Sequence, residues 1–370
     1  MLYYMRAIVV GGGIVGLFTA YYLRREGVDV VVVDQQSLGE TSRAAAGILE
    51  FTRFKINRIN VKGYPTSYLL MLSRGAARIR HIDLKWLMAY ARVYDRDPGP
   101  ETWEQIRDMG KFSWSEYRRL AEEKNDFDYA EEPLYELVKD VEREAEELRR
   151  DPLNPKFEVS ELEGRPAIAY LEAAKLSTDL AVERLISEAD ARHVRASADE
   201  IGDGYVVVAG KRVEADLVVV AAGWRTAKLL GAPVAPFKGY GYRLKTAQRP
   251  RAMFIDLADT GIAVVPLSGW VKVTGRFDLD STEDHSPSAK VLEAARKLFG
   301  DVEVIDMAVG YRPCTPDGLP ILEKIGERLV VATGACRLGW TFGPAMGKLA
   351  ADLGLGRLKS TSFTSRRFLQ

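Results

Sequence analysis

Close to its start the chain carries a glycine-rich hexapeptide, Gly11-Gly12-Gly13-Ile14-Val15-Gly16. It fits the pattern G-x-G-x-x-G, in which Gly11 turns the chain, Gly13 lets a pyrophosphate approach the backbone and Gly16 lets a helix pack closely on a strand. The context fits, because the residues before the glycines are β-rich and those after them are strong helix formers. The hexapeptide therefore predicts a dinucleotide-binding turn.

The residues around this turn supply the other parts of such a site. Backbone N–H groups at Ile14 and Val15, the first residues of the predicted helix, favour a bound phosphate. Val28–Asp34 is a continuous β-branched run, typical of a strand that is buried on both faces. Asp34 ends that strand where an acid can accept hydrogen bonds from a ribose, and Gln35 lies beside it.

A second segment pairs an arginine with a rigid turn. It reads G-Y-R-P-C-T-P-D-G-L-P over Gly310–Pro320, so prolines, a glycine and an aspartate fix the backbone next to Arg312. Because a guanidinium binds a planar carboxylate through two parallel hydrogen bonds, Arg312 is the first candidate for holding a carboxylate-bearing substrate. The hydroxyls of Tyr311 and Tyr240 are its candidate partners, with aromatic packing as the alternative role for both.

Three segments together resemble the D-amino-acid oxidase superfamily: Gly310–Pro320, Leu217–Gly223 (L-V-V-V-A-A-G) and Thr41–Leu49 (T-S-R-A-A-A-G-I-L). The resemblance implies FAD as the cofactor, an amine or amino-acid substrate, and Arg312 as the residue that holds its carboxylate. Beyond the glycine turn it implies cofactor contacts from Thr41, Ser42, Arg43, Ala45, Ala46, Gly47, Ile48, Ala222, Gly223, Trp224, Arg312, Arg337, Leu338, Gly339, Trp340 and Thr341.

The segment Leu338–Thr341, just ahead of the last predicted helix, has a further expected role. Its backbone N–H groups and the positive end of that helix favour an anionic reduced flavin. Trp340 is expected to wall the substrate pocket, with simple packing as the alternative. No general base is evident, and a bound neutral amine needs none, because loss of a hydride leaves an iminium that water hydrolyses.

Two further segments, Phe237–Tyr242 and Leu338–Thr341, resemble the bacterial D-amino-acid dehydrogenase small subunit. This favours hydride removal from the CH–NH bond of a small D-amino acid such as D-proline, with a dye- or quinone-type electron acceptor. The alternatives are a glycine/sarcosine-type amine oxidase that uses oxygen and an FAD-binding subunit of a larger proline dehydrogenase complex. An NAD-linked dehydrogenase would share the glycine turn but leave the Arg312 segment unexplained.

The chain departs from the superfamily at one position of the substrate pocket. Many relatives carry a tyrosine three residues before the proline of an inner strand, where it contacts the substrate carboxylate. Here that place is Ala263, in the sequence I-A-V-V-P that ends at Pro266. The pocket is therefore not the typical one.

The order of predicted elements gives an α/β fold with two domains. Helices are expected near 85–96, 101–124 and 140–150, over Ser177–Ala191 and over Pro344–Leu353; strands are expected at Arg6–Val10, near 239–247, 261–266 and 270–276, and at Leu329–Thr333. The expected domains are a Rossmann-type FAD-binding domain, 1–50, 168–235 and 306–370, and a second α+β substrate domain built on an antiparallel sheet, 51–167 and 236–305.

Composition narrows the functional classes. The formal net charge of the 370 residues is zero, which gives no global attraction to nucleic acid. Three histidines and two cysteines argue against a metal site. Cys314 and Cys336 form no disulfide framework, so a reducing, cytoplasmic compartment is expected. The sarcosine-oxidase branch binds flavin covalently through a cysteine ahead of the T-P-D turn. Here Cys314 lies inside that turn, so FAD is expected to be non-covalent. Scarce Asn and Gln beside plentiful Lys, Arg and Glu suit a thermophile.

Residues 62–92 combine basic and apolar side chains. Leucines, tryptophan and tyrosines are mixed there with Lys62, Arg74, Arg78, Arg80, Lys85 and Arg92. A basic amphipathic surface binds anionic membranes, and an ordinary pair of surface helices is the alternative. Peripheral association with the inner face of the cell membrane therefore stays open.

Overall fold

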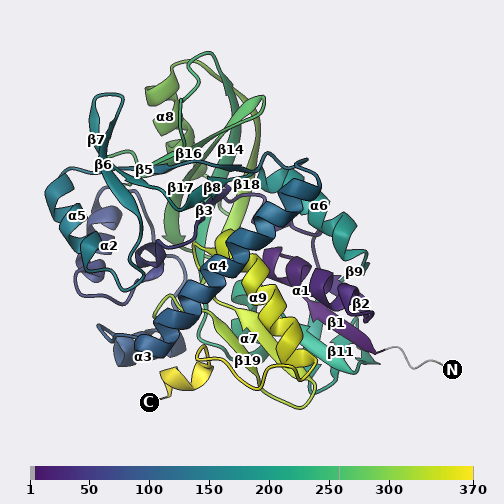
Figure 1. Cartoon of the computed structure of the whole chain (residues 1–370). Helices are drawn as coiled ribbons and strands as arrows, with labels where there is room; N and C mark the ends of the chain where they lie inside the picture. The colour runs from purple at the N-terminus through teal and green to yellow at the C-terminus, as the bar shows by residue number, and fades with distance from the viewer. Residues whose placement is uncertain (1–4, 258, 370) are drawn as a thin grey trace.

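The computed structural model describes residues 5–257 and 259–369, which form a mixed α/β fold around two large sheets (Figure 1). The first sheet has six strands in the order β19-β20-β13-β1-β2-β9. All of them run parallel except the edge strand β19. The strands are β1 (Arg6–Val10), β2 (Asp29–Asp34), β9 (Arg192–Arg195), β13 (Leu217–Val220), β19 (Ile321–Lys324) and β20 (Leu329–Thr333).

Both faces of this sheet are covered, as a parallel sheet requires. Ala7 and Val9 of β1 face the helices α1, α6 and α9, and α4 lies over α9 (Figure 1). Ile8 and Val10 face the other way, towards a small sheet of β10, β11 and β12. These elements are α1 (Ile14–Arg25), α4 (Pro100–Glu123), α6 (Thr178–Ala189), α9 (Gly339–Gly354), β10 (Ala198–Gly202), β11 (Tyr205–Val208) and β12 (Lys211–Glu214).

The second sheet has eight strands in the order β18-β14-β17-β16-β15-β5-β7-β6 and lies in the upper part of Figure 1. Its pairs are antiparallel except β15 with β5. The strands are β5 (Leu134–Leu137), β6 (Phe157–Leu162), β7 (Arg165–Tyr170), β14 (Ala235–Thr246), β15 (Phe254–Asp256), β16 (Ile262–Leu267), β17 (Trp270–Leu279) and β18 (Val302–Cys314).

Smaller elements complete the fold. A second three-stranded sheet has the strand order β3-β8-β4. The apolar face of α8 packs on the eight-stranded sheet. The elements are β3 (Ile48–Glu50), β4 (Ala130–Glu131), β8 (Ala173–Lys175), α2 (Tyr64–Ser73), α3 (Leu84–Val93), α5 (Val141–Arg149), α7 (Thr226–Leu230) and α8 (Ser288–Phe299).

The predicted helices and strands are present with shifted ends, whereas other elements, among them β6, β7 and β18, were not predicted. Ser177 caps α6 by accepting a hydrogen bond from the backbone N–H of Leu180. α9 begins at Gly339 rather than at Pro344, and α8 lies in a stretch where the alternating pattern predicts strands. The expected domain boundaries at residues 167/168 and 305/306 fall inside β7 and β18, so both strands of the eight-stranded sheet cross them.

Candidate active site

The turn between β1 and α1 is closed tightly by glycine. Gly11 has a φ of +106°, and a Cβ there would lie 2.3 Å from the carbonyl oxygen of Ala221. A Cβ on Gly16 would lie 1.9 Å from the carbonyl oxygen of Gly11. A Cβ on Gly13 would meet only the Oγ of Ser42, at 3.5 Å. Gly11 and Gly16 therefore shape the turn itself, whereas the free space at Gly13 faces outward.

The start of α1 opens into a cavity of about 720 Å³. Gly13 offers no side-chain cap, and the backbone N–H of Ile14 donates to the Oγ of Ser42 at 3.0 Å, so the positive helix end and the remaining N–H groups of the first turn favour an anion. Asp34 lines the cavity, and its carboxylate accepts from the backbone N–H groups of Gly12 and Gln36 at 2.7 and 2.8 Å. The predicted cofactor residues that line it are Gly11, Gly13, Ile14, Val15, Asp34, Gln35, Thr41, Ser42, Ala45, Ala222, Gly223, Trp224, Arg312, Arg337, Gly339 and Trp340.

The remaining predicted cofactor residues do not line the cavity but hold its walls. Arg43 donates to the carbonyl of Asp179 and pairs with Glu183. Gly47 has a φ of +83°, and a Cβ there would lie 2.1 Å from the carbonyl oxygen of Leu176. The others outside the lining are Gly16, Ala46, Ile48, Leu338 and Thr341.

Glycines in the eight-stranded sheet let the loop after β2 cross it closely. A Cβ on Gly241 of β14 would lie 2.4 Å from the carbonyl oxygen of Ala44, and a Cβ on Gly310 of β18 would lie 3.0 Å from that of Thr41. Trp340 fixes the same loop, since its Nε1 donates to the carbonyl of Ser42 at 2.9 Å. The loop and Trp340 thus form a rigid wall between the two sheets.

Two guanidiniums, those of Arg312 and Arg337, meet at the cavity. Their carbon atoms lie 5.6 and 3.9 Å from the centre of the Phe277 ring. Arg312 donates to the carbonyl of Arg276 at 3.0 Å, and Arg337 donates to that of Ile56 at 3.1 Å. Both line the cavity, which accounts for the part of their surface that stays accessible.

The electrostatics of this pair call for an anion. Burial, reinforced by the charge of Arg337, lowers the pKa of Arg312 to about 10. Burial also lowers the pKa of Arg337. Among the described residues, no carboxylate oxygen lies within 4.0 Å of either guanidinium. Two enclosed cations without a paired carboxylate are costly, so the arrangement favours a small anionic ligand in the cavity.

The two tyrosines expected to assist Arg312 point elsewhere. Tyr240 is 1% exposed, does not line the cavity, and has its hydroxyl 3.4 Å from the carbonyl of Asp284. Tyr311 lines the cavity but donates to the carbonyl of Thr282 at 3.3 Å and packs on Trp224. The expected partnership at a substrate carboxylate is therefore wrong: neighbouring residues of a strand face opposite ways, so Tyr311 cannot share the face of Arg312.

Cys314 and Cys336 form a disulfide, with Cα atoms 4.3 Å apart across a sequence separation of 22 residues. The expectation of no disulfide is wrong. The end of β18 and the loop after β20 meet, where the N–H of Cys336 donates to the carbonyl of Pro313 at 3.0 Å. The bond therefore ties together the two segments that carry Arg312 and Arg337. Disulfides also occur inside the cells of hyperthermophilic archaea, so the bond alone does not identify a compartment.

Removing this disulfide should destabilise the protein. Closing a loop of 22 residues restricts the unfolded chain, and we expect the Cys314→Ser/Cys336→Ser double variant to lose about 3 kcal/mol of unfolding free energy. Urea unfolding of both proteins under non-reducing conditions measures this difference. Wild type treated with a thiol reductant is the control and should unfold like the variant. Two free thiols in denatured, unreduced wild type would contradict the bond.

A dinucleotide turn at the carboxyl end of a parallel sheet, joined to a cavity that an antiparallel sheet closes, defines a dinucleotide-binding protein with room for a second ligand. The family model described as DAO, FAD dependent oxidoreductase, matches residues 6–353. The chain belongs to this family, and FAD is its cofactor. The site fits FAD: Gly11 and Gly16 leave no room for a Cβ at the turn, and Gly13, Ile14 and Val15 at the positive end of α1 line the cavity.

Comparison with individual proteins agrees with the family. D-proline dehydrogenase of Pyrobaculum islandicum is 56% identical over 366 residues, which cover 98% of this chain and 99% of that protein. The crystal structure of L-proline dehydrogenase from P. horikoshii superposes with a TM-score of 0.72 at 17% identity, covering 100% and 99% of the two chains. Glycine oxidase from Geobacillus kaustophilus gives 0.70 at 20% identity and 95% coverage of both. The two solved structures establish the shared fold.

The sequence prediction did not bring together three residues in and around the pair of guanidiniums. Arg337 was expected to contact only the cofactor, and neither Phe277 nor Tyr64 was singled out. Tyr64 begins α2, and its buried hydroxyl has no hydrogen-bond partner among the described residues. No local signal marks these residues, because they meet only when α2, β17 and the loop after β20 come together.

Proposed function

We propose that the protein oxidises the CH–NH bond of a small amino acid, a D-amino acid such as D-proline, and passes the electrons to a dye- or quinone-type acceptor. The observation that carries this proposal is the pair of enclosed guanidiniums, Arg312 and Arg337, at the cavity without a carboxylate partner. An amino-acid substrate supplies the missing carboxylate. The 56% identity to D-proline dehydrogenase of Pyrobaculum islandicum supports D-proline in particular.

Each side chain has a role in this proposal. Arg312 binds the substrate carboxylate and Arg337 adds a second positive charge, which together fix the position of Cα. Trp340, held by its bond to Ser42, forms a wall that keeps water from the reacting carbon. The cavity-lining residues of the turn between β1 and α1, with Asp34, hold the cofactor. When bound, FAD would supply the redox chemistry as the acceptor of a hydride.

We propose that FAD is held without a covalent bond. Both cysteines of the chain are joined to each other, and no free cysteine is present in the described residues. A thioether to the flavin would require one of these sulfur atoms. Acid precipitation of the holoenzyme should leave the yellow cofactor in the supernatant.

A substrate panel tests the proposed function. The FAD-loaded enzyme is given D-proline, D-alanine, sarcosine, glycine and L-proline, with an artificial dye or with oxygen as the acceptor. We expect the highest kcat/KM with D-proline and dye, and little peroxide. Activity restricted to L-proline would overturn the D-specific assignment, and peroxide formed as fast as dye is reduced would overturn the acceptor.

We also propose that the surface made by α2, α3 and the loop between them rests on the inner face of the cell membrane. No helix in the described part of the chain has the length and apolar content that crossing a bilayer requires. This surface, however, exposes an unusual set of apolar side chains among its basic ones: Leu69 64%, Leu70 48%, Ile79 46%, Ile82 73%, Leu84 71%, Leu87 44% and Met88 56%. Apolar contact and anionic headgroups together hold such a surface.

Vesicle binding checks this surface. We expect the holoenzyme to co-sediment with vesicles of phosphatidylglycerol and phosphatidylcholine, and the Ile82→Asp/Leu84→Asp variant to stay mostly in the supernatant. Val159→Asp is the matched control, because Val159 is 58% exposed on β6, outside this surface. Equal sedimentation of all three proteins would contradict the proposed docking.

A further inference from the structure

Within the described part of the chain, the hydroxyl of Tyr64 is an unpartnered polar group near the two guanidiniums, although Tyr64 is not among the residues that line the cavity. Its oxygen is buried, yet it has no hydrogen-bond partner among the described residues. A buried hydroxyl without a partner loses the hydrogen bonds it had with water, so it is kept only at a cost. Such a group points to a ligand that supplies the partner.

The surroundings of Tyr64 are otherwise apolar and well packed. Its ring stacks on that of Tyr68, with centres 6.2 Å apart and planes at 14°. Tyr68 in turn meets Phe277 edge-on at 6.5 Å. Phe277 is the residue whose ring lies under the guanidiniums of Arg312 and Arg337. Tyr64 therefore belongs to the same apolar cluster that supports the two cations.

Electrostatics agree with this placement. Burial raises the pKa of Tyr64, and the positive charges of Arg337 and then Arg312 act in the opposite direction. The net shift is upward, so the phenol keeps its proton at neutral pH. Tyr64 is thus a hydrogen-bond donor near two cations, and all three groups are complementary to an anion.

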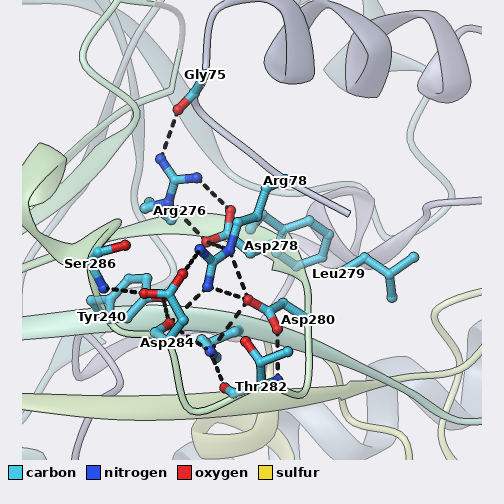
Figure 2. A network of polar contacts seen from close by, with 12 residues as sticks. Gly75, Arg78, Tyr240, Arg276, Asp278, Leu279, Asp280, Thr282, Asp284 and Ser286 are labelled. Atoms are coloured by element: carbon cyan, nitrogen blue, oxygen red, sulfur yellow. Dashed lines mark hydrogen bonds and ion pairs between the residues drawn. The ribbon is translucent and has the colours of Figure 1, made fainter. Parts of the chain in front are cut away.

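The helix that carries Tyr64, α2, is fixed to β17, the strand whose residue Arg276 accepts a hydrogen bond from Arg312. At its middle, Tyr68 donates to the carbonyl of Phe277 at 3.1 Å and accepts from the N–H of Leu279 at 3.2 Å. Just beyond its end, the carbonyl of Gly75 accepts from Arg276 at 2.7 Å, as Figure 2 shows. α2 and the anion site therefore cannot shift independently.

Arg276 joins these contacts to Arg312 itself. Its side chain pairs bidentately with Asp278, at 2.9 and 2.8 Å, in the centre of Figure 2. Its backbone is held at a φ of +70°, which is uncommon for a residue other than glycine. In this conformation its carbonyl accepts from Nη1 of Arg312 at 3.0 Å. One edge of the Arg312 guanidinium is thereby occupied, and the rest can serve a ligand.

We propose that Tyr64 donates a hydrogen bond to the substrate carboxylate, beside Arg312 and Arg337, as the third anchor of the site. This inference rests on the proposed function. It also accounts for Ala263: the inner strand lacks the tyrosine seen there in many relatives, and a hydroxyl arrives from α2 instead. The carboxylate would then be bound by residues of β18 and α2, together with Arg337 from the loop after β20.

The Tyr64→Phe variant tests the proposal, because it removes only the hydroxyl. We expect the KM for D-proline to rise about tenfold while kcat changes less than about twofold, since a lost hydrogen bond to a carboxylate acts on binding. The KM for pyrrolidine, which lacks a carboxylate, should stay the same. Thermal stability of the substrate-free holoenzyme should be retained or increased, because no protein hydrogen bond is lost.

A matched control and a second readout complete the experiment. Tyr90→Phe removes a hydroxyl of the same cluster that donates to the carbonyl of Ile59, so it should lower stability and leave the KM unchanged. Pyrrole-2-carboxylate is a planar, non-reacting analogue of the substrate. A titration with it, monitored through the flavin absorption spectrum, should show about tenfold weaker binding to Tyr64→Phe. Equal affinity for this probe would overturn the role of Tyr64.

The outcome separates this inference from the proposed function. Arg312→Lys is measured in parallel with the same probe. If it binds pyrrole-2-carboxylate as tightly as wild type, the carboxylate site itself is wrong. If Arg312→Lys weakens binding and Tyr64→Phe does not, the carboxylate site at Arg312 is supported and only the proposed role of Tyr64 is wrong.

Discussion

With D-proline as substrate, we expect the Arg312→Lys variant to lose about 100- to 1000-fold in kcat/KM. Lysine keeps a positive charge but cannot reproduce the planar fork that binds a carboxylate and reaches the carbonyl of Arg276 at the same time. Truncating one partner of an enclosed, hydrogen-bonded ion pair typically costs about 2–5 kcal/mol, and the expected loss lies within these limits. Steady-state kinetics of the FAD-loaded protein measure the change.

Two comparisons show whether this loss comes from the carboxylate. With pyrrolidine the variant and wild type should differ little, because no carboxylate is present to bind. Arg118→Lys alters an exposed arginine that pairs with Glu131 and should leave kcat/KM unchanged. Since the pKa of Arg312 is lowered to about 10, its charge is lost above that pH, and wild-type affinity for pyrrole-2-carboxylate should fall there. Unchanged D-proline kinetics in Arg312→Lys would refute the clamp.

The glycine turn gives the second large effect, and two of its residues should fail differently. We expect Gly16→Ala to yield protein without flavin and with disrupted folding, because its Cβ would lie 1.9 Å from a backbone carbonyl oxygen. Gly13→Ala should fold normally, since its Cβ meets only the Oγ of Ser42 at 3.5 Å. It should nevertheless bind FAD about 10- to 100-fold more weakly, because the methyl group occupies space that the pyrophosphate needs.

Flavin content and thermal unfolding of the apoproteins distinguish these cases. Gly13→Ala apoprotein should unfold at the wild-type temperature, and titration with FAD should reveal the lower affinity. Gly27→Ala is the control: its Cβ has no atom within 4 Å, and its φ of +78° makes the change mildly destabilising without touching the cavity. Wild-type FAD affinity in Gly13→Ala would show that the cofactor does not approach this residue.

Local patterns in the sequence were sufficient for the cofactor half of the molecule. The β-branched run and the glycine spacing are each set by neighbours in the chain, so their physics is readable from sequence. α8 was missed although Val291, Ala295 and Phe299 recur at helical spacing, because strands with period two surround it. Secondary structure was therefore predicted less well where a helical period of 3.6 residues adjoins strands with a period of two.

The substrate half depends on contacts between distant segments. In Phe237–Tyr242, Gly239 lines the cavity beside Arg312 and Gly241 lies against the backbone of Ala44, whereas the tyrosines face the core. The sequence analysis chose Tyr240 for its hydroxyl and so selected the wrong face. The pairing of Cys314 with Cys336 and the approach of Tyr64 to the arginines are likewise set by tertiary packing, which no spacing encodes.

The two guanidiniums belong to different halves of the architecture. Arg312 lies on β18 of the eight-stranded sheet, whereas Arg337 lies in the loop between β20 of the six-stranded sheet and α9. A chain in which only one of the two sheets has folded therefore presents only one of the two arginines to the substrate. Binding of the substrate through both arginines requires that the two sheets have assembled correctly.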